Sequence, residues 1–187
     1  MSSSPSAPRA SVARRAFSGA VPTDCWYVLA DSASVGREPL AVRAVGVPVA
    51  LYRTRDGRPV ALEDRCAHRA YPLSAGTVVD DELRCGLCGW VYDADGQCIE
   101  VPTQPRVPFG AHVASYPVCE QDGMVWVWLG ERGRARLHRV PELPWLDDPG
   151  WATVGGRAEI AAGFLLLHEN FADVTQVPFV APEITPE

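Results

Sequence analysis

Four side chains of metal-binding type, placed in two short runs, constrain this chain more than any other feature. Cys66 and His68 stand one residue apart in "DRCAHR", and after sixteen further residues Cys85 and Cys88 form a Cys-x2-Cys pair in "RCGLCGW". Two donors so close in sequence can bind the same metal centre only if they lie in a tight loop. The fold must therefore bring the tips of two such loops together. Four such donors satisfy either a zinc ion or a [2Fe–2S] cluster. Structural zinc knuckles prefer two to four residues between ligands, so the single-residue gap favours the cluster.

The size and charge of the chain exclude several classes of partner. Its 187 residues suit one domain, or one domain with an appendage. A net charge of −6 gives no broad attraction to nucleic acid or anionic lipid. No apolar run is long enough to cross a bilayer. We therefore expect neither a nucleic-acid nor a membrane partner.

The six cysteines are too few for a disulfide scaffold of this length. Three of them cluster at ligand spacing, which favours bound metal, a reducing compartment and a cytoplasmic protein. The scattered Cys25, Cys98 and Cys119 are expected to be small buried hydrophobic residues.

Short apolar runs separated by turn signals predict a mainly β fold. Residues 45–53 and 59–64 read as the two strands of one hairpin. Residues 124–130, "MVWVWLG", are apolar on both faces and predict an interior strand. Three Asp-Gly pairs mark the hairpin turns, because glycine accepts a positive φ without steric cost: Asp56-Gly57, Asp95-Gly96 and Asp122-Gly123.

Composition divides the chain into four segments. We expect a disordered tail over 1–22, a β domain over 23–130, an exposed linker over 131–150 and a further segment over 151–187. In the last segment, 151–163 suggests a strand, and 164–177 predicts a helix that Pro178 terminates. The linker carries a basic run that either docks an acidic partner or is a solvated connection. This run consists of Arg132, Arg134, Arg136, His138 and Arg139.

Residues 26–130 resemble the N-terminal Rieske domain of Rieske non-haem iron oxygenases, above all α subunits of the vanillate-demethylase kind. The resemblance rests on "WYVLADS", "VGVPVALYRTRDGRPVALEDRCAHRAYPLSAG", "LRCGLCGWVYDADGQCIEVPTQ" and "YPVCEQDGMVWVWLG". It implies a domain of small antiparallel sheets and hairpins that binds a [2Fe–2S] cluster. A short α/β remnant of the oxygenase catalytic domain would follow it.

The cluster ligands depart from the family pattern of Cys-x-His followed by Cys-x2-His. The resemblance implies that Cys66 and Cys85 hold the buried iron, and that His68 and Cys88 hold the outer one. Cys88 replaces a histidine, so the set becomes three cysteines and one histidine. A thiolate carries a charge that neutral imidazole lacks, which predicts a reduction potential between those of Rieske and all-cysteine clusters, or one at the low end. Trp90 and the loop 70–76 are expected to shield the cluster from water.

The resemblance continues into a second motif, Asn-x2-Asp-x2-His-x4-His, which holds a mononuclear iron in the family. Asn170 and Asp173 match its first two positions, but Gln176 and Ala181 replace both histidines. Glutamine is a poor ligand for ferrous iron and alanine offers no donor, so we expect no functional mononuclear iron in this chain. Asp173 occupies the electron-bridging position, or is an ordinary solvated helix residue.

We therefore expect an electron-passing [2Fe–2S] subunit of an oxygenase system, served by a ferredoxin or a flavin reductase. It would form homo- or hetero-oligomers with oxygenase subunits. One alternative is a non-catalytic assembly subunit with a structural cluster or zinc. Another is an active mono- or dioxygenase with a rearranged iron site, using His168 or Glu169. We also expect a fragment of a longer protein, or else a helix at 164–177 that docks on another subunit.

Overall fold

The computed structural model describes residues 22–146, 148–156, 158–181 and 183. The described chain forms two compact units that divide between Leu143 and Pro144. The predicted tail over 1–22 lies, apart from Pro22, outside the described residues.

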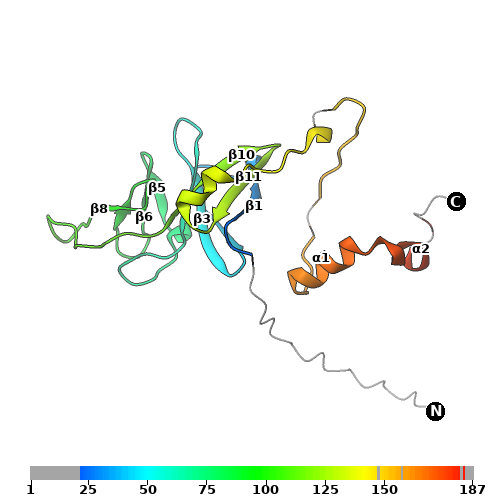
Figure 1. The fold of residues 1–187 in the computed structure, drawn as a ribbon. Coiled ribbons are helices and arrows are strands. Elements are labelled where there is room, and N and C mark those ends of the chain that lie inside the picture. The colour runs from blue at the N-terminus through cyan, green and yellow to red at the C-terminus, as the bar shows by residue number, and fades with distance from the viewer. Residues whose placement is uncertain (1–21, 147, 157, 182, 184–187) are drawn as a thin grey trace, which may run out of the picture. The chain divides into compact units, whose positions relative to one another are not determined.

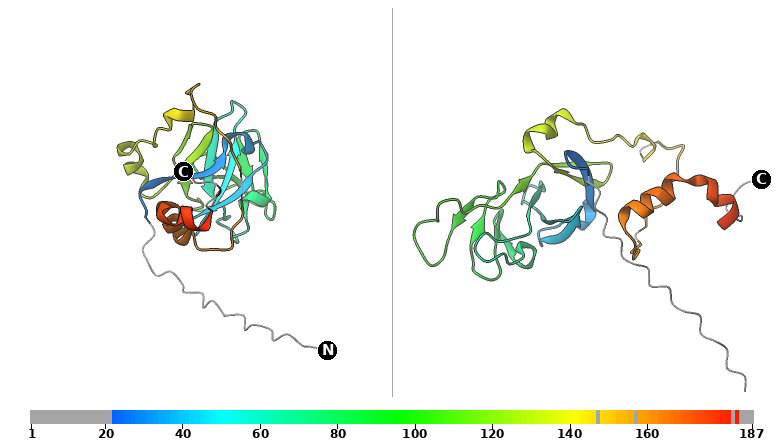
Figure 2. Two further views of the ribbon diagram at one scale, coloured as in Figure 1. Left: turned by 90° about the vertical axis from the view of Figure 1, so that its right-hand side faces the viewer. Right: turned by 60° about the horizontal axis from the view of Figure 1, so that its bottom comes forward.

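The first unit is built from short antiparallel strands arranged in three sheets, which confirms the predicted mainly β fold. In Figure 1, β5, β6 and β8 lie at one end of this unit and β1, β10 and β11 at the other, and Figure 2 shows it from two further directions. The sheet orders are β1-β11-β10, β2-β3-β4-β9 and β5-β6-β7-β8. The strands are β1 (Cys25–Asp31), β2 (Leu40–Ala44), β3 (Val47–Arg53), β4 (Pro59–Glu63), β5 (Thr77–Val79), β6 (Glu82–Arg84), β7 (Val91–Tyr92), β8 (Cys98–Glu100), β9 (Ser115–Tyr116), β10 (Val118–Gln121) and β11 (Met124–Leu129). Three 3₁₀ turns accompany them: η1 (Ser32–Ser34), η2 (Leu73–Ala75) and η3 (Arg132–Leu137).

The predicted interior strand is β11, which pairs with β1 on one side and β10 on the other. Val125 and Val127 are fully buried in an apolar cluster with residues of β3 and β4. On the opposite face Trp128 is also fully buried and meets Trp26 edge to face, with 5.5 Å between ring centroids. Both faces of β11 are buried, which explains why its residues are apolar on both faces.

The three Asp-Gly pairs all lie at hairpin turns, as predicted, and each glycine has a positive φ. No Asp-Gly pair marks the hairpin of β2 and β3. Its turn is Val45-Gly46, where both residues have positive φ, at 45° and 86°. A β-branched residue rarely adopts that conformation, so the turn could not be recognised from residue preference.

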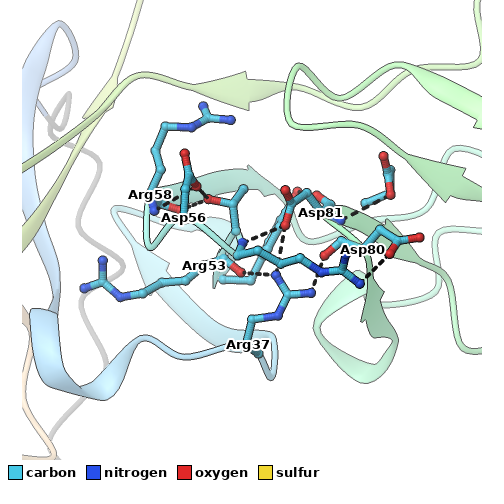
Figure 3. Close-up of polar contacts among 10 residues, drawn as sticks. Arg37, Arg53, Asp56, Arg58, Asp80 and Asp81 are labelled. Carbon is cyan, nitrogen blue, oxygen red and sulfur yellow. Dashed lines mark hydrogen bonds and ion pairs between the residues drawn. The ribbon is translucent and has the colours of Figure 1, made fainter.

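Polar contacts join the turn of the β5–β6 hairpin to Arg37 and to the turn of the β3–β4 hairpin (Figure 3). Arg37 Nη1 lies 3.0 Å from Asp81 Oδ1, and the backbone N–H of Arg55 donates to the same oxygen at 2.7 Å. The Tyr52 hydroxyl donates to the carbonyl of Asp81 at 3.1 Å. These contacts fix the sheet of β5 to β8 against the sheet of β2 to β4.

The basic run expected in an exposed linker belongs to the first unit and partly pairs with other residues of that unit. Arg132 pairs with Asp95 at 3.3 Å, and Arg134 pairs with Asp24. The ring of His138 stacks on Trp128, 5.2 Å between centroids. Two of the five basic residues are thus neutralised within the chain.

The second unit departs from the predicted elements. Described residues of 151–163 contain no strand, so that expectation is wrong. The predicted single helix over 164–177 is also wrong, because the helix ends at Ala172 and Pro178 lies within a later turn of helix. Asp173 leaves the helical conformation at φ −94° and ψ 88°, and its carboxylate accepts from the backbone of Thr175 at 3.1 Å. The elements are η4 (Pro144–Leu146), α1 (Phe164–Ala172), η5 (Val174–Gln176) and α2 (Val177–Val180).

Candidate metal centre

The first metal-binding loop follows β4 and closes on itself. The N–H of Cys66 donates to the carbonyl of Tyr71 at 2.8 Å, and the N–H of Ala70 donates to the carbonyl of Cys66 at 2.8 Å. Asp64 anchors the loop, because its two carboxylate oxygens accept from the N–H and the hydroxyl of Ser74, each at 2.7 Å. The loop is therefore held at both ends.

The second loop, between β6 and β7, repeats the same bonding pattern. The N–H of Cys85 donates to the carbonyl of Trp90 at 2.8 Å, and the N–H of Gly89 donates to the carbonyl of Cys85 at 3.0 Å. Gly89 has φ +74°, a conformation that glycine adopts without strain. Both loops thus fold a cysteine beneath a turn in the same way.

A glycine lets the two loops approach each other closely. A Cβ on Gly86 would lie 2.5 Å from the carbonyl oxygen of Ala75, which is shorter than any ordinary contact. Any larger side chain at this position would separate the second loop from the end of η2.

The two loops bring three thiols together. The sulfur atoms of Cys66, Cys85 and Cys88 all lie within 4.8 Å of one another, and those of Cys66 and Cys88 are 3.6 Å apart. Cys66 and Cys85 are each only 2% exposed, and Cys88 is half-buried. His68 lies outside this group and is exposed; its ring stacks on Trp90, 5.0 Å between centroids and 10° from parallel. The structure thus groups three of the four predicted ligands.

Tyr92, which the sequence analysis missed, lies against the thiol of Cys66. Its side chain is fully buried, and its hydroxyl lies 3.2 Å from the sulfur of Cys66. The N–H of Ala67 donates to the same hydroxyl at 3.0 Å, so the hydroxyl proton is free to point to the sulfur. The only sequence signal was a tyrosine in a two-residue strand just after the Cys-x2-Cys pair.

The surroundings shift the pKa values of the Cys66 and Cys88 thiols in opposite directions. Burial raises the pKa of the Cys66 thiol, but hydrogen bonds from the Tyr92 hydroxyl and from the backbone of His68 outweigh burial and lower that pKa overall. Burial raises the pKa of Cys88, and the neighbouring thiols raise it further. Burial also raises the pKa of Tyr92, so its hydroxyl stays protonated as a donor. Of these two thiols, Cys66 therefore takes up negative charge more readily than Cys88.

The donor set fits a [2Fe–2S] cluster in number and in chemistry. Thiolates and imidazole are its protein ligands, and the two closed loops supply four such donors. The apolar cluster that contains Cys66 and Cys85 packs below them with Tyr52, Leu62 and Leu83, all fully buried. Beside the first loop lies an open hollow of about 470 Å³, whose lining includes Cys66, His68 and His112.

The other cysteines differ in exposure. Cys98 is buried, as predicted, whereas Cys25 and Cys119 are only half-buried.

The second motif forms contacts within its own segment. Gln176 Nε2 donates to Asn170 Oδ1 at 2.7 Å, and the Asp173 carboxylate accepts from Thr175. His168 packs edge to face against Phe164, with 5.9 Å between ring centroids. In the described part of the chain, the three cysteines are the only group of three or more His, Cys, Asp or Glu donors that converge.

The fold and the paired loops define a Rieske-type domain, and comparisons with known proteins agree. Residues 25–117 match the Rieske [2Fe-2S] domain family. The chain is 37% identical over 160 residues to the toluene-4-sulfonate monooxygenase system iron-sulfur subunit TsaM1 of Comamonas testosteroni, covering 85% of this chain and 46% of that protein. It is 36% identical over 159 residues to a vanillate O-demethylase oxygenase subunit of Pseudomonas sp. strain HR199, covering 85% of this chain and 45% of that protein. The crystal structure of dicamba monooxygenase bound to dicamba superposes with a TM-score of 0.77 at 34% identity, covering 83% of this chain and 47% of that one.

The chain is a homologue of the α subunits of Rieske non-haem iron oxygenases and carries their Rieske domain. It spans less than half the length of these relatives, 45–46% for the two curated proteins. Among the helices in the described ranges, none is both long and apolar enough to span a bilayer.

Proposed function

We propose that this chain carries single electrons in a Rieske oxygenase system, through a [2Fe–2S] cluster held by Cys66, His68, Cys85 and Cys88. The observation that supports it most directly is the convergence of three thiols from two closed loops, within 4.8 Å of one another. A cluster of this kind accepts and passes one electron at a time. The free thiols suit a reducing compartment, which favours the cytoplasm.

The residues around the loops have defined parts in this function. Tyr92 donates a hydrogen bond to the sulfur of Cys66, and such bonds tune the properties of metal ligands. Asp64 fixes the first loop through Ser74. The apolar cluster below excludes water from Cys66 and Cys85, whereas the exposed His68 marks the side from which electrons enter or leave.

The segment 170–181 would not hold a catalytic iron of its own. Ala181 provides no side-chain ligand, and the Gln176 amide bonds to Asn170. Oxygen chemistry would then take place at the iron of a partner oxygenase subunit, in a homo- or hetero-oligomer. Asp173 would keep the electron-bridging position of the family motif.

The electron donor would be a ferredoxin or a flavin reductase. The relatives named above are an iron-sulfur subunit of a monooxygenase system and an oxygenase subunit, which implies separate electron-supplying components. Arg136 and Arg139 remain exposed in the basic run, where opposite charge on a donor would speed association.

The test is to purify the full chain anaerobically and to measure iron, acid-labile sulfide and the EPR spectrum after dithionite reduction. We expect about two irons and two sulfides per chain and a reduced-cluster signal, as the cluster's composition requires. A colourless protein without an EPR signal after reduction would contradict the proposal. A third iron bound by the chain would contradict the assignment of 170–181.

A further inference from the structure

The two ligand loops continue two strands whose opposite ends are joined by a hydrogen bond. Cys66 lies in the loop that follows β4, and Cys85 directly follows β6. At the other end of these strands, the backbone N–H of Arg55, before β4, donates to Oδ1 of Asp81, before β6, at 2.7 Å. The contact between the two turns therefore lies one short strand away from each metal-binding loop.

Asp81 accepts hydrogen bonds from three separate segments of the chain. Its Oδ1 also lies 3.0 Å from Nη1 of Arg37, which precedes β2, and its carbonyl accepts from the hydroxyl of Tyr52 in β3 at 3.1 Å (Figure 3). The neighbouring Asp80, whose φ is +56°, forms an ion pair with Arg55. An exposed ion pair alone adds little, but here the charged oxygen also receives a backbone N–H, which makes the stronger kind of hydrogen bond. The turn before β6 is therefore fixed relative to β3 and to the turn before β4.

Tyr52 connects these contacts to the metal centre. Its side chain is fully buried in the apolar cluster that also contains Cys66 and Cys85. A close-packed interior is nearly incompressible and transmits displacements between neighbouring groups. A shift of Asp81 therefore reaches the sulfur atoms through the core as well as along β6.

We propose that Asp81 is a positioning residue for the metal centre, which sets the separation of the two ligand loops from the far ends of β4 and β6. It acts through the strands and through Tyr52, not as a ligand. The side chains of a metal site must be held within about 0.5 Å of their working positions, so small shifts between the loops matter. The inference deepens the proposed function and rests on it for its purpose, because the spacing serves the cluster.

Iron release from the cluster-loaded full chain to a chelator is the first test. Asp81→Ala should release iron about 10-fold faster, as expected when a support of metal ligands is lost, and the EPR lines of its reduced cluster should be broader. Asp81→Asn keeps an oxygen acceptor for Arg37 and Arg55, so its release rate should stay within a few-fold of the unmodified chain. Asp95→Ala is the matched control, because this carboxylate in the turn between β7 and β8 pairs with Arg132 at 3.3 Å, and its removal should leave iron release unchanged.

A second readout needs no cluster and measures the spacing of the loops directly. The sulfur atoms of Cys66 and Cys88, one from each loop, are 3.6 Å apart. In the cluster-free full chain with Cys85→Ser, oxidised glutathione converts these two thiols into a disulfide and is itself reduced to two molecules of glutathione. The equilibrium constant, read by mass spectrometry, gives the effective concentration of one thiol at the other, which falls as the loops separate. Asp81→Ala should lower it roughly 10-fold, the equivalent of one hydrogen bond of ordinary strength, and Asp95→Ala should not change it.

Urea unfolding of each variant separates positioning from overall stability. Equal values for Asp81→Ala and Asp95→Ala in both readouts would overturn the proposal. A loss that the unfolded fraction alone explains, or that Asp81→Asn does not restore, would overturn it too. Arg37→Leu takes the place of Asp81→Ala if that variant does not fold, with Arg43→Leu as its control, because Arg43 bonds within its own hairpin to the carbonyl of Gly46.

The positioning role and the proposed function fail separately. A chain that never assembles a cluster would remove the electron-transfer function, whereas the glutathione equilibrium would still decide whether Asp81 sets the spacing. A normal cluster with the same release rate and the same thiol equilibrium in Asp81→Ala would remove the positioning role and leave the function standing.

Discussion

Two motifs of this chain lack imidazoles that the resemblance to the family implies, one in the loops at 66–88 and one at 170–181, and the two differences have different consequences. In the first motif the residue at that position is Cys88, whose sulfur lies 3.6 Å from that of Cys66 and has the chemistry to bind metal. In the second the replacement is Gln176, whose amide hydrogen-bonds to Asn170 in its own segment. A motif keeps its capacity for metal when the new residue is also a donor and still faces the other donors.

Burial strengthens this contrast. The first motif rests on an apolar core in which Cys66 and Cys85 are fixed by closed loops. In the second unit, none of the described residues is buried, and Asp173 satisfies its carboxylate locally with Thr175. Donors that face solvent are free to bond their own backbone, so they are not held for an ion.

The largest expected effect comes from removing a buried thiol. Cys85→Ser should reduce bound iron from about two atoms per chain to near zero, because the cluster loses a ligand that no neighbouring residue replaces. Iron and sulfide analysis of the anaerobically purified protein measures it. Gln176→Ala is the matched change in the second motif and should leave the iron content unaltered. Equal loss in both variants would abolish the contrast between the motifs.

Restoring the imidazole sharpens the comparison next. Cys88→His should raise the midpoint potential of the cluster by on the order of 100 mV, since a neutral ligand replaces a charged one and Rieske centres lie above all-cysteine clusters. A potentiometric titration followed by EPR gives the value. An unchanged or lower potential would show that Cys88 is not a ligand.

Tyr92→Phe should have a smaller effect. Losing the hydrogen bond to the sulfur of Cys66 should weaken metal retention about 10–100-fold, as is usual for residues that support metal ligands. Iron release to a chelator measures this, with Tyr116→Phe as the control at a half-buried tyrosine outside the site. Identical release from both variants would leave Tyr92 with a packing role alone.

The smallest effect concerns pH. A hydrogen-bonded pair with Arg53 lowers the pKa of Glu120 from its ordinary 4.5 to about 2. The unfolded chain therefore binds this proton more readily, so the pair stabilises the fold above pH 4.5 and loses that contribution as the pH falls toward 2.

Glu120→Gln should consequently cost about 1 kcal/mol of unfolding free energy at pH 7, after allowance for solvent screening, and much less near pH 2. Urea unfolding followed by tryptophan fluorescence measures the difference. In the second unit Asp173→Asn is the counterpart, because Thr175 lowers the pKa of that exposed carboxyl too, and the unfolding curve of the β unit should not change. A pH-independent cost for Glu120→Gln would exclude the ion pair as its cause.

Local sequence signals predicted much of the fold, but they failed where contacts between residues decided the backbone conformation. The Asp-Gly turns and the strand over 124–130 were correct because turn preference and burial on both faces leave a direct pattern. The hairpin turn at Val45-Gly46 left no such pattern. The helix predicted over 164–177 ends before Asp173, because the Asp173 side chain accepts a hydrogen bond from the backbone N–H of Thr175.

The sequence by itself determined which donors the chain has: three thiols and one imidazole at ligand spacing, and an amide and a methyl group where two further imidazoles would stand. Only the tertiary structure decided which residues lie next to these donors. It places the sulfur of Cys88 close to that of Cys66, stacks His68 on Trp90 and places the Tyr92 hydroxyl against the sulfur of Cys66. The physical reason is that donor chemistry belongs to each residue, whereas distances between loops depend on packing and on backbone hydrogen bonds formed far apart in the chain.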